Sequence, residues 1–294
     1  MECLQTVDAM QSHADAARAD GHTLALVPTL GALHDGHLAL VRRALQEADH
    51  VTVSIFVNPT QFGPDEDFDA YPRDLEGDRE TLEALGVDAL FAPSVEEMYP
   101  FADDEAFEAP LAWVDMDQLD EHLCGAYREG HFRGVTTVVT KLFHACKPDI
   151  GVFGKKDAQQ YVILQRLVDD LLFDIDIVGV PTVRAEDGLA ESSRNAYLSD
   201  EERAQAPVLY EAVQAAAAAV QGGEQEVQAV VEAMDETLVT APDANVQYAE
   251  VVDARTLQPV DTLTPGQEVI AAVAVFFGET RLIDNAFLRV PPAE

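Results

Sequence analysis

The chain has little positive charge and no long apolar run, and each shortage excludes a class of protein. Its 294 residues include 18 lysines and arginines against 54 aspartates and glutamates, a formal net charge of −36. Nucleic-acid binding needs basic patches to meet the phosphates, so we expect no nucleic-acid partner. No stretch of about 18 apolar residues is present, so we expect no membrane span and no membrane partner.

Cysteine is scarce as well. Cys3, Cys124 and Cys146 stand far apart in the sequence and form neither a disulfide framework nor a zinc-ligand spacing. Residues 1–5 lack the basic segment and the following apolar segment of a secretory signal. These features predict a reducing, cytoplasmic location.

The acidic residues are spread through periodic sequence and are not gathered in a tail. This distribution argues against disorder and for a globular protein coated with carboxylates. Repulsion among the carboxylates destabilises a compact state in dilute buffer and is screened by salt. We therefore expect a halophilic acidic surface, from a host with a salt-rich cytoplasm. An ordinary acidic cytosolic protein is the alternative.

Apolar runs alternate with helical patterns through the first part of the chain. The predicted strands are 23–27, 51–57, 89–92, 149–153 and 174–180, and the predicted helices are 6–19, 36–48, 74–85, 134–146 and 158–172. This alternation predicts a doubly wound parallel sheet, a Rossmann-like α/β domain, over residues 1–181.

The pattern changes after Pro181. Two helices are predicted first, at 204–221 and 226–238, and then strands at 246–252, 268–277 and 280–287. Gly278-Glu279 is typical of a hairpin turn between the last two strands. Residues 182–294 are therefore predicted to form a smaller C-terminal α+β domain.

The most specific motif follows the first strand of that alternation. An apolar run at 24–27 is interrupted by Pro28 and Gly31, and a helical pattern then begins with His34 and His37 in its first turn. Open α/β sheets bind ligands at the carboxyl ends of their strands, and helix N-termini favour anions. This turn predicts a nucleotide-phosphate site. The alternative is a pair of incidental histidines on a surface helix.

A second polar cluster, Asn58 and Gln61, follows the next strand and opens onto the same edge. Neutral amides both donate and accept hydrogen bonds, which suits the hydroxyl and carboxylate groups of a small acid. A loop that uses its asparagine only to make a turn is the alternative.

A third cluster contains two of the four lysines in the chain, Lys155 and Lys156, between a strand and a helix. Positive charge beside a helix N-terminus suits a triphosphate. The GxxxxGK[ST] spacing of a P-loop is missing, and so is the GxGxxG of a dinucleotide site. An exposed solubilising pair is the alternative interpretation.

The fourth cluster places Ser192 and Ser193 beside Arg194, which predicts a phosphate clamp; a plain interdomain loop is the alternative. Another cationic group, which includes Arg128 and His131, either lines the site or has a structural role. Neither a Ser-His-Asp order nor an HExxH motif is present, which argues against a hydrolase.

Together these motifs resemble the pantothenate synthetase family, ligases that join pantoate to β-alanine. The likeness runs from residue 27 to residue 198 and continues weakly through 248–253. It rests on PTLGALHDGH at 28–37, FVNPTQFG at 56–63, GKKDAQQ at 154–160 and SSRN at 192–195.

The resemblance implies a two-step, AMP-forming reaction. The carboxylate of (R)-pantoate attacks the α-phosphate of ATP and releases pyrophosphate, and the amine of β-alanine then attacks the pantoyl adenylate and releases AMP. It also implies Mg²⁺ with the phosphates, a homodimer, and a C-terminal domain that closes over the site.

The resemblance further implies roles for single residues. His34, His37, Lys156 and Arg194 form the catalytic set, with His37 as the candidate proton donor. Gln61 and Gln160 hold pantoate, and Gln61 also lies near β-alanine. Asn58 joins them as a substrate contact on the evidence of the second polar cluster. The contacts to ATP are Leu30, Gly31, Ala32, Leu33, His34, Asp35, Gly36, His37, Gly154, Lys155, Lys156, Asp157, Val183, Glu191, Ser192, Ser193 and Arg194. No metal ligand is assigned.

Two positions depart from the family pattern, because Leu30 and Glu191 stand where methionine is usual. Glu191 adds a carboxylate beside the phosphate clamp, which should weaken ATP binding unless it turns outward or helps to hold magnesium.

Three alternatives remain at this point: a nucleotidylyltransferase of the same architecture, a nucleotide-binding regulator without turnover, and an NAD-dependent dehydrogenase. The first transfers AMP to a phosphate substrate, for which Gln61 and Gln160 are poorly suited. The last lacks its glycine motif.

Overall fold

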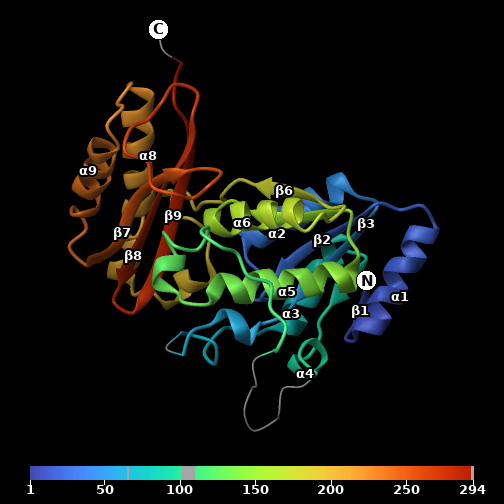
Figure 1. The fold of residues 1–294 in the computed structure, drawn as a ribbon. Helices are drawn as coiled ribbons and strands as arrows, with labels where there is room; N and C mark the ends of the chain where they lie inside the picture. The colour runs from blue at the N-terminus through green and yellow to red at the C-terminus, as the bar shows by residue number, and fades with distance from the viewer. Residues whose placement is uncertain (65, 101–109, 293–294) are drawn as a thin grey trace. The chain divides into compact units, whose positions relative to one another are not determined.

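The computed structural model describes residues 1–64, 66–100 and 110–292, which form two compact units (Figure 1). Unit 1 comprises Met1–Met116, Arg128–Gly154 and Ile163–Val180, and unit 2 comprises Asp117–Tyr127, Lys155–Val162 and Pro181–Glu294. Two short segments from the first two thirds of the chain therefore belong with unit 2. The domain boundary predicted after residue 181 stays a prediction.

Unit 1 is built on a six-stranded parallel sheet, which confirms the predicted α/β class. The strands lie in the order β1-β4-β3-β2-β5-β6. Their bounds are β1 (Glu2–Leu4), β2 (Leu24–Thr29), β3 (His50–Ile55), β4 (Ala89–Phe91), β5 (Ile150–Gly154) and β6 (Asp176–Val180). The order reverses between β2 and β5, so the topological switch point lies at the end of β2. Sequence patterning missed β1, a strand of three residues that pairs with β4 at the edge of the sheet.

Helices cover both faces of this sheet. α2 (Asp35–Glu47) and α3 (Leu75–Leu85) lie on one face, where Val41 and Leu82 join a core with Val27 and Val53. α1 (Val7–Ala19) and α5 (His131–Cys146) pack against each other and against β2. The connections through α2 and α3 run along the sheet in one direction and those through α1 and α5 in the other, so right-handed crossovers place the two pairs on opposite faces. The remaining helices are α4 (Val95–Met98) and α6 (Ala158–Asp170).

Pro28 lies inside β2, so this strand continues two residues beyond its predicted end at residue 27. The carbonyl of Thr29 accepts from the N–H of Phe56, so the backbone polar groups of Thr29 point toward β3. Those of Pro28 point to the opposite side, toward β5. On that side the pairing of β2 with β5 ends at Leu26↔Gly151. The missing N–H of proline is therefore tolerated, because the ladder has already opened there.

Unit 2 contains an antiparallel sheet of β7 (Ala244–Asp253), β8 (Glu268–Phe277) and β9 (Thr280–Arg289), in that order. The hairpin turn predicted at Gly278-Glu279 is confirmed. α8 (Val208–Gln221) and α9 (Val227–Leu238) lie beside this sheet (Figure 1) and share its hydrophobic core. The smaller α+β module is thus confirmed as a fold.

The helix predicted over 204–221 is wrong at its start. The structure has α7 (Asp200–Gln205) and then a separate helix, α8, after Pro207. Proline has no N–H for the preceding helix and clashes with the carbonyl four residues back, so the chain starts a new helix there. Among the described helices, none has the length and apolar character needed to cross a membrane.

Candidate active site

The turn between β2 and α2 lies at the switch point of the sheet. Gly31 and Ala32 both have positive φ, +85° and +51°, so the chain reverses sharply there. A Cβ on residue 31 would also lie 3.1 Å from Oδ2 of Asp78. The context predicted for the two histidines is confirmed, because His34 is the N-cap of α2 and His37 is its third residue.

The two imidazoles cap the helix reciprocally. Nδ1 of His34 accepts from the N–H of Gly36 at 3.1 Å, and the N–H of His34 donates to Nδ1 of His37 at 3.4 Å. The ring centroids are 4.1 Å apart. Because Nδ1 accepts in both rings, the neutral form of each carries its hydrogen on Nε2. Paired N–H donors at a helix N-terminus suit phosphate oxygens.

Asp78 of α3 fixes the preceding turn. Its Oδ2 accepts from the N–H of Ala32 and its Oδ1 from the N–H of Leu33, both at 2.9 Å. The side chain is buried, and this burial raises the pKa of Asp78 against the opposing effect of the two hydrogen bonds. Two of the backbone donors predicted to contact ATP are therefore engaged by a carboxylate within unit 1.

Asn58 follows β3 and is fully buried. Its Oδ1 accepts from the hydroxyl of Tyr99 at 2.7 Å and from the hydroxyl of Thr60 at 3.0 Å. Its Nδ2 donates to Oε1 of Gln61 at 3.2 Å and to the carbonyl of Gly134 at 3.3 Å. The amide is thus used inside the protein, and its direct effect here is to orient Gln61.

Gly134 lets α5 approach this segment. A Cβ at residue 134 would lie 2.2 Å from the carbonyl oxygen of Thr60. Any side chain there would push α5 away from η1 (Pro59–Gln61) and break the bond from Asn58 to the Gly134 carbonyl. This glycine therefore maintains the position of Gln61.

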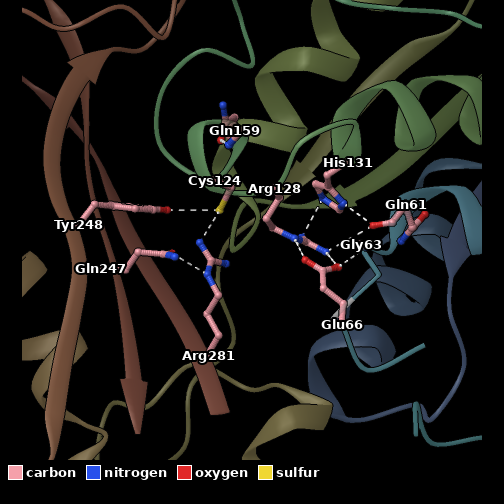
Figure 2. Close-up of polar contacts among 11 residues, drawn as sticks. Gln61, Gly63, Glu66, Cys124, Arg128, His131, Gln159, Gln247, Tyr248 and Arg281 are labelled. Carbon is pink, nitrogen blue, oxygen red and sulfur yellow. Dashed lines mark hydrogen bonds and ion pairs between the residues drawn. The ribbon is translucent and has the colours of Figure 1, made fainter. Parts of the chain in front are cut away.

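An ion pair also supports the backbone at Gln61 (Figure 2). Nε and Nη2 of Arg128 lie 2.6 and 2.7 Å from the two carboxylate oxygens of Glu66, and Nη2 also donates to the carbonyl of Gln61 at 3.4 Å. Glu66 accepts the N–H of Gly63 at 3.2 Å. Burial alone would raise the pKa of Glu66, but the hydrogen bond and charge of Arg128 lower it overall.

His131, the first residue of α5, completes this support. Its Nδ1 lies 2.8 Å from the carbonyl of Gln61, and its Nε2 lies 2.9 Å from Nη1 of Arg128. Arginine has only donors, so Nε2 accepts and Nδ1 carries the hydrogen that is donated to Gln61. Of the two roles open for Arg128 and His131, the structure shows a supporting one.

The lysine loop connects β5 to α6. Its carbonyls at Lys155 and Lys156 accept from Nδ2 of Asn285 at 3.1 and 2.7 Å. The ammonium of Lys155 lies 5.2 Å from the ring centroid of Phe287, and that of Lys156 lies 3.8 Å from Oδ1 of Asp157. Both cations therefore have identified neighbours in unit 2.

Gln160 is half-buried in the first turn of α6, and its neighbour Gln159 is buried. Nε2 of Gln159 donates to the carbonyls of Leu119 and His122, both at 2.8 Å, and its Oε1 accepts from Gly125. Gln159 is thus structural, whereas Gln160 keeps the role predicted for it as a proposal.

The same segment, 117–127, is held by a second polar cluster of unit 2 (Figure 2). Sγ of Cys124 lies 3.3 Å from the hydroxyl of Tyr248 and 3.4 Å from Nη2 of Arg281. Burial, together with Cys124, raises the pKa of the Tyr248 phenol well above its ordinary value. This phenol is therefore neutral at physiological pH.

The predicted phosphate clamp forms a compact turn. Oγ of Ser192 accepts from the N–H of Arg194 at 3.3 Å and caps η3 (Ser193–Tyr197). The N–H of Glu191 donates to the carbonyl of Val183 at 2.9 Å. Glu191 is half-buried. The chain from Val183 to the serines is thus a closed loop whose ends lie together.

The two units divide the predicted residues between them. Unit 1 contains residues 30–37, Asn58, Gln61 and Gly154. Unit 2 contains residues 155–157, Gln160, Val183 and residues 191–194. Within each unit, hydrogen bonds join segments that are distant in the sequence. Arg128 and His131 make them in unit 1, and Asn285 makes them in unit 2.

Sequence reasoning missed several supporting residues: Glu66, Asp78, Tyr99, Gly134, Asp284 and Asn285. The local sequence did not distinguish them, since Asp78 stands among the polar residues of α3 and Asn285 in a strand that mixes polar and apolar residues.

Comparison with known proteins shows similarity over nearly the whole chain. The family model of the pantoate-beta-alanine ligases matches residues 2–287. A pantothenate synthetase of Salinibacter ruber (strain DSM 13855 / M31) is 80% identical over 294 residues, with 100% of both chains covered.

Two crystal structures are similar as well. Pantothenate synthetase from Thermus thermophilus is 45% identical with a TM-score of 0.88, and the match covers 99% of this chain and 100% of the other. Pantoate-beta-alanine ligase from Francisella tularensis, complexed with beta-gamma ATP and beta-alanine, is 31% identical with a TM-score of 0.78. The latter match covers 98% of this chain and 97% of the other.

Proposed function

Because the chain belongs to the pantoate–β-alanine ligase family, we propose how its residues carry out the reaction of that family. The chain catalyses the ATP-dependent condensation of pantoate with β-alanine to pantothenate. A pantoate carboxylate oxygen forms a bond to the α-phosphorus as the bond to the bridging oxygen breaks and pyrophosphate leaves. The amine nitrogen of β-alanine then bonds to the acyl carbon as the bond to AMP breaks, and the amine gives up its proton.

The observation that carries the assignment of roles is the histidine pair at the start of α2. His34 and His37 present Nε2–H donors beside the positive end of a helix at the switch point of the sheet. We assign phosphate binding to both and proton donation to the departing pyrophosphate to His37. Residues 30–37 contact the nucleotide in this proposal.

Cations supply the rest of the electrostatic stabilisation. Charge develops on the transferred phosphorus oxygens and on pyrophosphate, so fixed positive groups lower the barrier. Lys156 and Arg194 have this role in our proposal, with further nucleotide contacts from Gly154, Lys155, Asp157, Val183, Glu191, Ser192 and Ser193. No protein nucleophile is needed, since the substrates provide the attacking carboxylate and amine.

Gln61 and Gln160 hold pantoate, and Gln61 also lies near β-alanine. Neutral amides bind the hydroxyls and the carboxylate of pantoate without adding charge beside the phosphates. The position of Gln61 supports this assignment, because Asn58, Arg128 and His131 all fix it. Asn58 takes part through Gln61, and its predicted direct contact with substrate stays a prediction.

We propose Mg²⁺ as the companion of the ATP phosphates. In the described part of the chain, no group of three histidine, cysteine or acidic residues is arranged to hold a metal ion. The ion would take most of its ligands from phosphate oxygens and water, and Asp157 of the lysine loop would be a candidate protein donor. When bound, the ion neutralises phosphate charge.

Three further properties belong to the proposal: a homodimer, a cytoplasmic location and adaptation to salt. The salt proposal rests on the formal net charge of −36. The homodimer follows from the family resemblance, and three free cysteines support a reducing, cytoplasmic location.

Product analysis with single omissions tests the assignment. Pyrophosphate formation should require ATP and pantoate, and steady AMP formation should require β-alanine as well. A nucleotidylyltransferase would instead transfer AMP to a phosphate substrate without any need for β-alanine. AMP formation that is independent of β-alanine would overturn the proposal.

A further inference from the structure

The strand β9 contains two adjacent polar residues that are almost completely buried. Asp284 is 2% exposed and Asn285 is 7% exposed. Successive side chains of a strand point to opposite faces of the sheet, so these two residues serve different faces. Each contacts a loop that is proposed above to bind ATP, and all of these residues belong to unit 2.

Asn285 holds the lysine loop by its backbone. Its Nδ2 donates to the carbonyls of Lys155 and Lys156 at 3.1 and 2.7 Å, which uses both hydrogens of the amide. In a trans peptide the carbonyl and the following N–H point in opposite directions. The N–H groups of Lys156 and Asp157 are therefore turned away from Asn285. They precede the N-terminus of α6, which begins at Ala158.

Two N–H groups that point away from Asn285 beside the start of a helix are suited to an anion. Phe287, two residues along β9 and on the same face as Asn285, has its ring centroid 5.2 Å from the ammonium of Lys155. Residues of β9 therefore fix the position of the loop backbone and contact the side chain of Lys155.

Asp284 holds the second loop. Its carboxylate forms a two-point ion pair with Arg184, with Nη1 2.5 Å from Oδ2 and Nη2 2.9 Å from Oδ1. Nη1 of Arg184 also donates to the carbonyl of Gly188 at 3.0 Å, and the guanidinium lies 4.3 Å from the ring centroid of Tyr210. This pair closes the loop that leads from Val183 to the Ser192–Arg194 clamp.

We infer that Asp284 and Asn285 are positioning residues for ATP, because neighbouring residues of one strand orient both nucleotide loops of unit 2. Asn285 orients the backbone N–H groups of Lys156 and Asp157 toward a phosphate. Asp284 holds Arg184 and thereby fixes the position of the Ser192–Arg194 clamp. The inference rests on the proposed nucleotide role of these loops. It adds that the ATP contacts depend on two residues of β9 to which the proposed function gives no substrate contact.

The substitution Asn285→Asp tests the inference, because it keeps the shape but replaces both donors with an acceptor. We expect the KM for ATP to rise about tenfold or more, as two hydrogen bonds are lost and carboxylate faces carbonyl. The KM for pantoate and the KM for β-alanine should stay within about twofold. Asn245→Asp makes the same chemical change at an exposed position of β7 and should leave all three constants unchanged.

Asn285→Ala serves as the second variant if Asn285→Asp does not fold, since it removes the donors without adding charge. A thermal melt of each variant identifies a purely structural effect. Equal rises in all three KM values, or a lower melting temperature with an unchanged KM for ATP, would overturn the inference. If the unmodified protein itself makes no pantothenate, the proposed function fails instead, so the two failures are distinguishable.

Discussion

Arg128 and Glu66 form a two-point ion pair across 62 residues of sequence, with Nε 2.6 Å from Oε1 and Nη2 2.7 Å from Oε2. The pair is partly buried, with side-chain exposures of 18% and 27%. A charge-assisted pair of this geometry holds both side chains in one arrangement. Arg128 and its neighbour His131 both donate hydrogen bonds to the carbonyl of Gln61, so this arrangement fixes the position of that carbonyl.

The first prediction follows from this pair. Glu66→Gln should raise the KM for pantoate about 5- to 30-fold, because a neutral amide holds Arg128 less firmly and Gln61 loses its fixed position. The KM for ATP should change far less. Steady-state kinetics with each substrate varied in turn gives the comparison. An equal change in both constants would show that the pair supports the whole fold and has no particular effect on Gln61.

The stability difference between the wild type and Glu66→Gln should depend on pH. The pKa of Glu66 is lowered from its ordinary value of 4.5, so the folded protein keeps this carboxylate ionised at a pH where the unfolded chain binds a proton. Its contribution is complete above pH 4.5 and is lost as the pH falls through the lower pKa of the folded state. Denaturant unfolding should show the wild type more stable than Glu66→Gln at pH 7 by about 1–2 kcal/mol. The gap should narrow in acid, and a constant gap would contradict the prediction.

Asp78→Asn should loosen the turn before α2. An amide accepts only one of the two N–H groups now held by the carboxylate, and its own NH₂ then faces the other donor. We expect kcat/KM for ATP to fall about 10- to 100-fold and stability to fall by about 1–3 kcal/mol. Glu80→Gln, an exposed charge change on the same helix, is the control. Unchanged kinetics in Asp78→Asn would exclude a role of this carboxylate in placing the histidine turn.

Gln61→Glu should weaken the binding of pantoate and leave the binding of ATP nearly unchanged. The new carboxylate has the same shape and still accepts from Asn58, but it repels the carboxylate of the substrate. The KM for pantoate should rise about 10- to 100-fold, with the KM for ATP within about twofold. Gln5→Glu, at an exposed position of unit 1, controls for the added charge. If only the KM for ATP rose, Gln61 would not belong to the pantoate site.

His37→Asn should slow the chemical step. The shorter amide keeps a hydrogen-bonding group near the position of Nδ1 but donates no proton to pyrophosphate, so kcat should fall about 10²-fold or more. The KM for pantoate should change little. Single-turnover release of pyrophosphate measures the step directly, and His144→Asn at an exposed position of α5 is the control. A normal rate of release would remove His37 from the catalytic set.

Salt should increase both activity and stability. ATP and pantoate are anions that approach a chain with a formal net charge of −36, so repulsion slows their encounter in dilute buffer. We expect kcat/KM to rise roughly tenfold between dilute buffer and about 1 M KCl, and the melting temperature to rise as well. Sucrose at equal osmolarity separates screening from a general solute effect. A steady fall of kcat/KM from the lowest salt would contradict the prediction.

The sequence by itself determined most elements of the fold and the strand–turn–helix context of the two histidines. The spacing of apolar residues gave α2 and β2 to within two residues, because periodicity and the interruption at Gly31 are local properties of the chain. His34 and His37 could be placed for the same reason, since the start of a helix and the end of a strand are encoded in adjacent residues.

Only the tertiary structure decided which side chains hold these groups in place. Asp78 accepts a hydrogen bond from Ala32, which is 46 residues away in the sequence, and Asn285 donates one to Lys155, which is 130 residues away. The same carboxylate or amide would be taken for a surface residue in any local pattern, because its partner is chosen by packing between elements. The buried state of Asn58 was hidden for the same reason, since Tyr99 and Gly134 enclose it only after β3, α5 and the chain after α4 have come together.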